Sequence, residues 1–111
     1  MSVRYSHCLY IIFYEFVFNL QALQEFSELV TNSELEVVKT VLPFWPRLYC
    51  QLAVDIEHRV REAAHQALRA VVLRVKRNLA PYLRQLAGPW FTSQYDTYPP
   101  AASAAALAFQ V

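Results

Sequence analysis

The sequence contains very little glycine. Gly88 is the single glycine among 111 residues, whereas 56% of the residues are apolar. Glycine supplies the positive backbone angles of many tight turns, so its scarcity argues against turn-rich β structure. The apolar content argues against disorder. The composition therefore predicts an all-α fold with one modest core, which is what a chain of this length can bury.

An excess of charge of one sign is also missing. Ten lysines and arginines stand against nine aspartates and glutamates, which leaves a formal net charge of +1. The chain as a whole therefore has no field that would attract nucleic acid or an anionic membrane. Any such partner requires a local patch.

Groups that carry enzyme chemistry are sparse. The two cysteines, Cys8 and Cys50, lie far apart without a C-x-x-C spacing, and the sequence has no glycine-rich phosphate loop. We expect no catalytic residue, no cofactor site and no metal site in this segment. The cysteine usage predicts free thiols in a reducing compartment, the cytosol.

Residues 1–20 form an atypical apolar N-terminal segment. Its core, "CLYIIFYEFVFNL", has the outline of a signal peptide, but it is short for a membrane span and Glu15 interrupts it. No small-residue cleavage site follows. We favour an apolar helix or strand that packs on its neighbours, or a mis-joined start, over a signal or a membrane anchor.

Residues 21–111 show helical periodicity with proline breaks. Ser33 and Glu36 have the spacing of a capping box, and Asp55 is placed to cap the helix that follows it. Pro43 should end one helix, and Gly88 with Pro89 should kink another. The predicted helices run over about 20–30, 34–42, 45–54, 56–78 and 83–96, before an alanine-rich segment.

A shift of 41 residues reveals an internal repeat. The shift superposes Asp55 on Asp96 and Tyr49 on Trp90. It also aligns three alanine pairs: Ala63 with Ala104, Ala64 with Ala105, and Ala67 with Ala108. Each unit is a proline-kinked helix, an aspartate turn and an alanine-rich helix. A period near 40 with two helices is typical of HEAT solenoids, so we predict a HEAT-type fragment of antiparallel helix pairs, about two repeats long.

The stretch "DIEHRVREAAHQAL" resembles the HEAT signature. In that signature a turn aspartate is followed by Val-Arg and by small residues at the start of the second helix. We expect Arg61 to reach the turn carboxylate of an adjacent unit, while the alanines let the helices close. The second unit carries Ala101 and Ala102 in place of Val-Arg, so a continuous arginine ladder is not expected. The signature positions here are Asp55, Val60, Arg61, Ala64, Ala67 and Leu68.

Five ordered blocks resemble the N-terminal domain of the listerin family. They cover most of residues 22–110, whereas residues 1–20 fall outside them. The Pro-Phe-Trp-Pro-Arg and Asp-Thr-Tyr-x-Pro-Ala features make the resemblance more specific than a HEAT match alone. The blocks are "ALQEF", "VLPFWPRLYCQLAVD", "RVREAAHQAL", "LAPYLRQLAGPWF" and "QYDTYPPAASAA".

The resemblance implies a function that the residues alone do not. Listerins are HEAT-repeat E3 ubiquitin ligases of ribosome-associated quality control, and they ubiquitinate nascent chains stalled on large ribosomal subunits. Their catalytic RING, with its zinc, is C-terminal and is absent from this chain. The expected role of the segment is docking to the large subunit, to the cofactor that senses peptidyl-tRNA, and to the rest of the solenoid. A small-molecule substrate and a membrane are not expected.

His58, Glu62 and His65 share one side of the predicted helix at 56–78. Their spacing differs from the H-E-x-x-H arrangement of zinc proteases, and no fourth ligand is near in sequence. We favour a solvated helix face over a metal or general-base site for all three.

A basic cluster is the stronger candidate for a partner site. Between Asp55 and Arg84 the sequence carries seven cationic residues and three carboxylates, which gives a local net charge of +4. Such a cluster is either a solvated face that offsets a helix dipole or a patch for phosphate or an acidic partner. The candidate contact residues are Arg69, Arg74, Lys76, Arg77 and Arg84.

An alternative function comes from the fold rather than from the family. A HEAT-repeat adaptor of transport or cytoskeletal type, with no link to ubiquitin, would show the same helical pairs.

Overall fold

The computed structural model describes residues 19–108, in which helices and turns but no strands occur. The all-α prediction is thus confirmed for this range. The apolar segment 1–20 lies outside the described residues except for its last two, which begin the first helix. The elements are α2 (Asn19–Asn32), α3 (Leu35–Lys39), α4 (Trp45–Leu52), α5 (His58–Val75), the 3-10 helix η2 (Lys76–Tyr82), α6 (Leu83–Ser93) and α7 (Pro99–Ala108).

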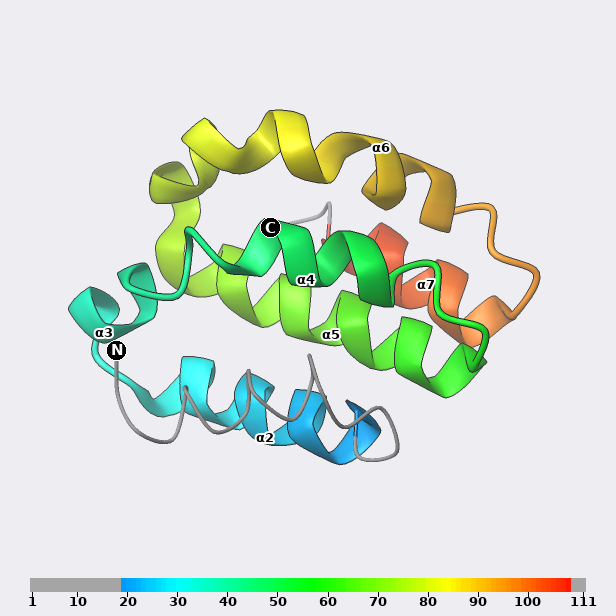
Figure 1. The fold of residues 1–111 in the computed structure, drawn as a ribbon, viewed down its shortest axis with the longest axis horizontal. Helices are drawn as coiled ribbons and strands as arrows, with labels where there is room; N and C mark the ends of the chain where they lie inside the picture. Colours follow the sequence, from blue (N-terminus) through cyan, green and yellow to red (C-terminus); the bar gives the residue numbers. More distant parts are fainter. Residues whose placement is uncertain (1–18, 109–111) are drawn as a thin grey trace.

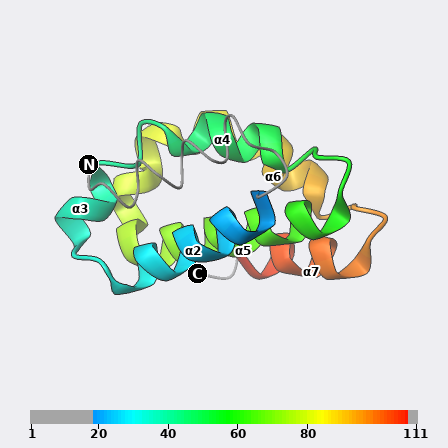
Figure 2. The same ribbon diagram turned by 60° about the horizontal axis from the view of Figure 1, so that its bottom comes forward.

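The helices form two layers. Figure 2 shows α4 and α6 side by side in one layer and α2, α5 and α7 in the other. The two turns that connect the layers, α4 to α5 and α6 to α7, lie at the same end of the molecule (Figure 1). The short elements α3 and η2 lie at the opposite end.

Helix α5 is the centre of the core. It packs along α2 on one side and along α7 on the other, while α4 covers a third side. Ala64 and Ala67 are fully buried, and small side chains at these positions allow neighbouring backbones to approach closely. The predicted close-packing face of this helix is therefore confirmed.

Aromatic side chains join the two layers near α2. Trp45 and Phe26 are fully buried, and their rings stack with centroids 5.0 Å apart. Offset or stacked aromatic pairs of this kind contribute about 0.5–1.5 kcal/mol beyond their buried area. Trp45 thereby anchors the start of α4 to the C-terminal half of α2.

Two predicted caps are wrong by one or two residues. Helix α3 begins at Leu35 with Glu34 at the N-cap, and the Glu34 side chain makes no capping bond. Helix α5 is capped by Glu57, whose Oε1 accepts the Arg59 amide at 3.2 Å. Asp55 instead accepts the Glu57 amide at 2.9 Å, which fixes the turn before the helix.

The C-terminal end of α5 lies three residues before the predicted end. Lys76 has φ 46° and ψ −115°, a backbone conformation that costs energy for any residue with a side chain. The Asn78 amide group donates to the Val75 carbonyl at 3.0 Å and satisfies one of the helix-end acceptors. The chain then tightens into η2, which contains Pro81, before α6 begins.

The proline breaks have different outcomes. Pro43 lies in the turn before α4, and Pro46 occupies the first turn of that helix, as predicted. Helix α6, in contrast, runs without interruption through Gly88 and Pro89. Proline has no amide hydrogen, so the Gln85 carbonyl lacks its usual helical donor. The Cys50 thiol lies 3.3 Å from that carbonyl and donates to it from α4.

Candidate partner interface and the ion pair that supports it

Arg61 connects the two inter-layer turns. Its Nε and Nη2 donate to the two carboxylate oxygens of Asp96, at 2.7 and 3.0 Å. Its Nη1 donates to the carbonyls of Asp55 and Ile56, at 2.9 and 3.1 Å. Asp96 lies between α6 and α7, so Arg61 does reach the turn carboxylate of the adjacent helical pair, as the sequence predicts.

The ion pair lies largely out of water. The Arg61 side chain is 17% exposed and the Asp96 side chain 8%. The Arg61 guanidinium lowers the pKa of Asp96, and the Asp96 carboxylate raises the pKa of Arg61. A bidentate, shielded pair with two further backbone acceptors is satisfied well enough to offset its desolvation cost.

The two aspartates of the repeat have the same local geometry. Asp55 Oδ1 accepts the amide of Glu57, and Asp96 Oδ1 accepts the amide of Tyr98 at 2.8 Å. Each aspartate therefore closes a turn and lies three residues before the first residue of its helix. The equivalence extends to the aromatic position of the repeat, because Tyr49 and Trp90 are both buried and both bond to the following helix.

The remaining signature residues lie on the inward side of α5. Val60 is 6% exposed and Leu68 is fully buried, like the two alanines between them. None of them is available to a partner. Their role is to fill the space that α5 shares with α2 and α7.

The prediction that His65 faces solvent is wrong. The ring is fully buried, and its Nδ1 lies 3.1 Å from the Tyr49 hydroxyl, within hydrogen-bonding distance. Its Nε2 is buried without a partner among the described residues. Burial lowers the pKa of His65 to about 4. Because α5 is covered on three sides, the helix has a narrower solvated stripe than a surface helix would have.

His58 and Glu62 are part-exposed rather than fully solvated. The His58 ring packs against Tyr98 with centroids 4.0 Å apart, and Glu62 lines shallow grooves on the outer side of α5. Within residues 19–108, no three histidine, cysteine or acidic side chains come together in a way that could hold a metal ion.

The basic cluster divides into a structural member and exposed members. Arg74 is part-buried and its Nη2 donates to the Ser33 carbonyl at the end of α2, so its role is to join α5 to the α2–α3 turn. Lys76, Arg77 and Arg84 are exposed, and none has an ion pair with a described carboxylate. Arg69 is likewise exposed, on the outer stripe of α5.

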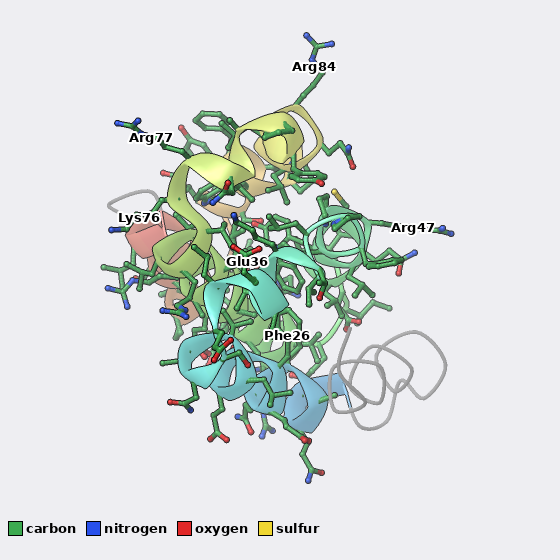
Figure 3. All side chains as sticks on the ribbon, turned by 90° about the vertical axis from the view of Figure 1, so that its left-hand side faces the viewer. Phe26, Glu36, Arg47, Lys76, Arg77 and Arg84 are labelled. Atoms are coloured by element: carbon green, nitrogen blue, oxygen red, sulfur yellow. The ribbon has the colours of Figure 1, made fainter. Side chains whose placement is uncertain are left out.

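The exposed cations do not converge on one point. Figure 3 shows Lys76 and Arg77 projecting from the same side of the molecule and Arg84 pointing away from α6 in another direction. Arg47 points to the opposite side. Lys76, Arg77 and Arg84 nevertheless all belong to the end of the molecule formed by η2 and the start of α6. We refer to these three residues as the basic end.

A family model for the N-terminal domain of an E3 ubiquitin-protein ligase matches residues 19–111. That ligase is listerin, and the chain belongs to the listerin family. Listerin of Mus musculus is 50% identical over 91 residues, 82% of this chain, and listerin of Gallus gallus is 49% identical over 96 residues, 86% of it. Listerin of Drosophila melanogaster is 46% identical over 90 residues, 81% of the chain.

The chain spans about 5% of the length of these curated relatives. No solved structure matches the chain. No helix within the described range is both long and apolar enough to cross a membrane.

Replacing Arg61 with alanine should destabilise the chain. The change leaves the Asp96 carboxylate shielded and without its guanidinium, which costs about 2–4 kcal/mol. For a domain of this size the melting temperature should fall by about 10 °C or more, as measured by circular dichroism. Arg59→Ala is the matched control, because Arg59 is 68% exposed and should change stability by less than about 0.5 kcal/mol. An unchanged melting temperature for Arg61→Ala would contradict the structural role.

His65 should make the folded state sensitive to mild acid. Its folded-state pKa is below that of the unfolded chain, so unfolding takes up a proton below about pH 6.5 and stability decreases from there toward pH 4. Between pH 7 and pH 5 the loss should be about 2 kcal/mol, measured by urea titration.

His65→Gln should remove most of that pH dependence, whatever its effect on absolute stability. His58→Gln serves as the control and should keep the wild-type dependence. If the His65 variant loses stability as steeply as the wild type, buried His65 is not the group that titrates.

Proposed function

We propose that this segment is a non-catalytic docking part of a listerin-type E3 ligase that ubiquitinates nascent chains stalled on large ribosomal subunits. The observation that carries the proposal is the match of residues 19–111 to the listerin N-terminal domain. Catalysis would belong to a RING, with its zinc, elsewhere in the parent protein. The proposed partners are the large ribosomal subunit, the cofactor that senses peptidyl-tRNA, and further helical pairs.

The proposal includes a HEAT-type solenoid as the framework. Two findings support it: the helices alternate between two layers, and the turns at Asp55 and Asp96 have the same geometry 41 residues apart. In such an array each pair buries its faces against its neighbours, so Arg61 would hold two successive pairs in register. The adaptor alternative has the same framework, but no observation favours it over a ligase now that the family is known.

The basic end is the proposed contact to ribosomal RNA. Its three cations are exposed and lack ion pairs with described carboxylates, so binding phosphate would not require breaking an existing contact. Each phosphate contact releases condensed counterions and so makes binding depend on salt. Arg69 is a further candidate, whereas Arg74 is better explained by its bond to Ser33. The proposed compartment is the cytosol.

Charge reversal at the basic end should weaken binding to the ribosome. In a full-length listerin that carries this segment, Lys76→Glu with Arg77→Glu and Arg84→Glu should reduce co-sedimentation with large subunits. The salt dependence should also become shallower, by about one unit of log–log slope for each lost contact.

Two single charge reversals are compared as a matched pair, Arg77→Glu and Arg47→Glu. Arg47→Glu is the control, because Arg47 lies on another side of the molecule. Arg74 is left unchanged so that a folding defect is not mistaken for lost binding. Equal binding by the triple variant and the wild type at low and moderate salt would remove the basic end from the interface.

A further inference from the structure

The end of the molecule opposite α3 and η2 exposes large apolar side chains. Among the described residues, the most exposed large hydrophobic side chains are Ile56 at 98%, Tyr95 at 88% and Val54 at 72%. All three belong to the two inter-layer turns, which lie at the same end of the molecule (Figure 1). Phe91, 59% exposed, lies one helical turn before Tyr95. We refer to Val54, Ile56 and Tyr95 as the apolar edge.

A groove of about 570 Å³ runs between the two turns. Apolar side chains form much of its wall, and Arg61 and Asp96 also line it. The lining apolar residues are Ala53, Val54, Pro89 and Tyr95. Val54 and Tyr95 of the apolar edge therefore line a concave site, and Ile56 lies two residues after Val54 in the same turn.

Most polar side chains that line the groove are already hydrogen-bonded, while Thr97 is exposed at its edge. Four of the five N–H groups of Arg61 donate to Asp96 and to two backbone carbonyls. The Ser93 hydroxyl donates to the Pro89 carbonyl, and the Thr92 hydroxyl donates to the Gly88 carbonyl. Little donor capacity remains for a phosphate or a carboxylate. The chemistry of the groove suits an apolar side chain.

The charges near the groove favour a cationic neighbour. Five charged residues lie in the α4–α5 turn, the first residues of α5 and the α6–α7 turn. Three are carboxylates and two are cations: Asp55, Glu57 and Asp96, and Arg59 and Arg61. Because Arg61 and Asp96 neutralise each other inside the groove, the net charge beside the groove comes from the other three residues, which do not line it. Its net value is −1. This sign is opposite to that of the basic end.

We propose that the apolar edge and its groove bind an amphipathic segment of a partner protein, with apolar anchors flanked by lysine or arginine. The anchors enter the groove between Val54 and Tyr95, and the flanking cations lie near Asp55 and Glu57. The interaction uses a part of the molecule that is separate from the basic end. Its test therefore does not depend on the proposed ribosome contact.

Three labelled synthetic peptides of equal length test the proposal by fluorescence anisotropy with the whole chain. One combines leucine and lysine, one leucine and glutamate, and one serine and lysine. The leucine–lysine peptide should bind at least about tenfold more tightly than either of the others. Ile56→Ser combined with Tyr95→Ser should weaken its binding about tenfold or more. Both side chains are almost fully exposed, so folding should be unaffected.

Matched variants distinguish binding at this site from nonspecific binding to exposed apolar side chains. Leu73→Ser combined with Leu83→Ser removes two side chains that are 44% and 45% exposed elsewhere, and it should leave peptide binding unchanged. Glu57→Gln retains an acceptor for the Arg59 amide and should weaken binding of the leucine–lysine peptide about two- to fivefold.

Three results would overturn the proposal. The first is unchanged peptide binding by the Ile56–Tyr95 double variant, and the second is equal binding of the serine–lysine peptide, which would indicate charge alone. The third is that none of the peptides binds. In that case the wild type and the double variant are also tested for binding to phosphatidylserine-containing vesicles and for self-association in analytical ultracentrifugation. Loss of either interaction in the double variant would assign the apolar edge to a membrane or to a second copy.

Discussion

The contact between Arg61 and Asp96 determines how the two helical pairs sit together. One guanidinium binds the carboxylate of the α6–α7 turn and two carbonyls of the α4–α5 turn. Charge-assisted bonds that are shielded from water depend strongly on geometry, so they favour one relative position of the turns over others. The shared position of the two aspartate turns, and the groove between them, follow from this contact.

Much of this arrangement could be predicted from the sequence, because it depends on local chemistry that repeats. The aspartate turn and the arginine six residues after Asp55 are short-range patterns, and the 41-residue shift identifies Asp96 as their counterpart. The exact cap was less predictable. Asp55 and Glu57 can both accept an amide near the start of α5, and the choice between them depends on the shape of the turn.

The errors in the candidate site come from tertiary structure. A helical wheel places His65 beside His58 and Glu62, but it does not show that Tyr49 of α4 packs against His65 and bonds to it. Arg74 looked equivalent to its cationic neighbours, yet it reaches a carbonyl 41 residues earlier. Sequence spacing identifies residues on one face of a helix. Burial of that face depends on helices elsewhere in the chain.

A double-mutant cycle measures directly how strongly Arg61 and Asp96 couple the two helical pairs. Free energies of unfolding would be determined for the wild type, Arg61→Ala, Asp96→Ala and the double variant. We expect a coupling free energy of about 2 kcal/mol, with the double variant little less stable than either single variant. A coupling below about 0.5 kcal/mol would show that the two side chains act independently and that the ion pair does not hold the helical pairs together.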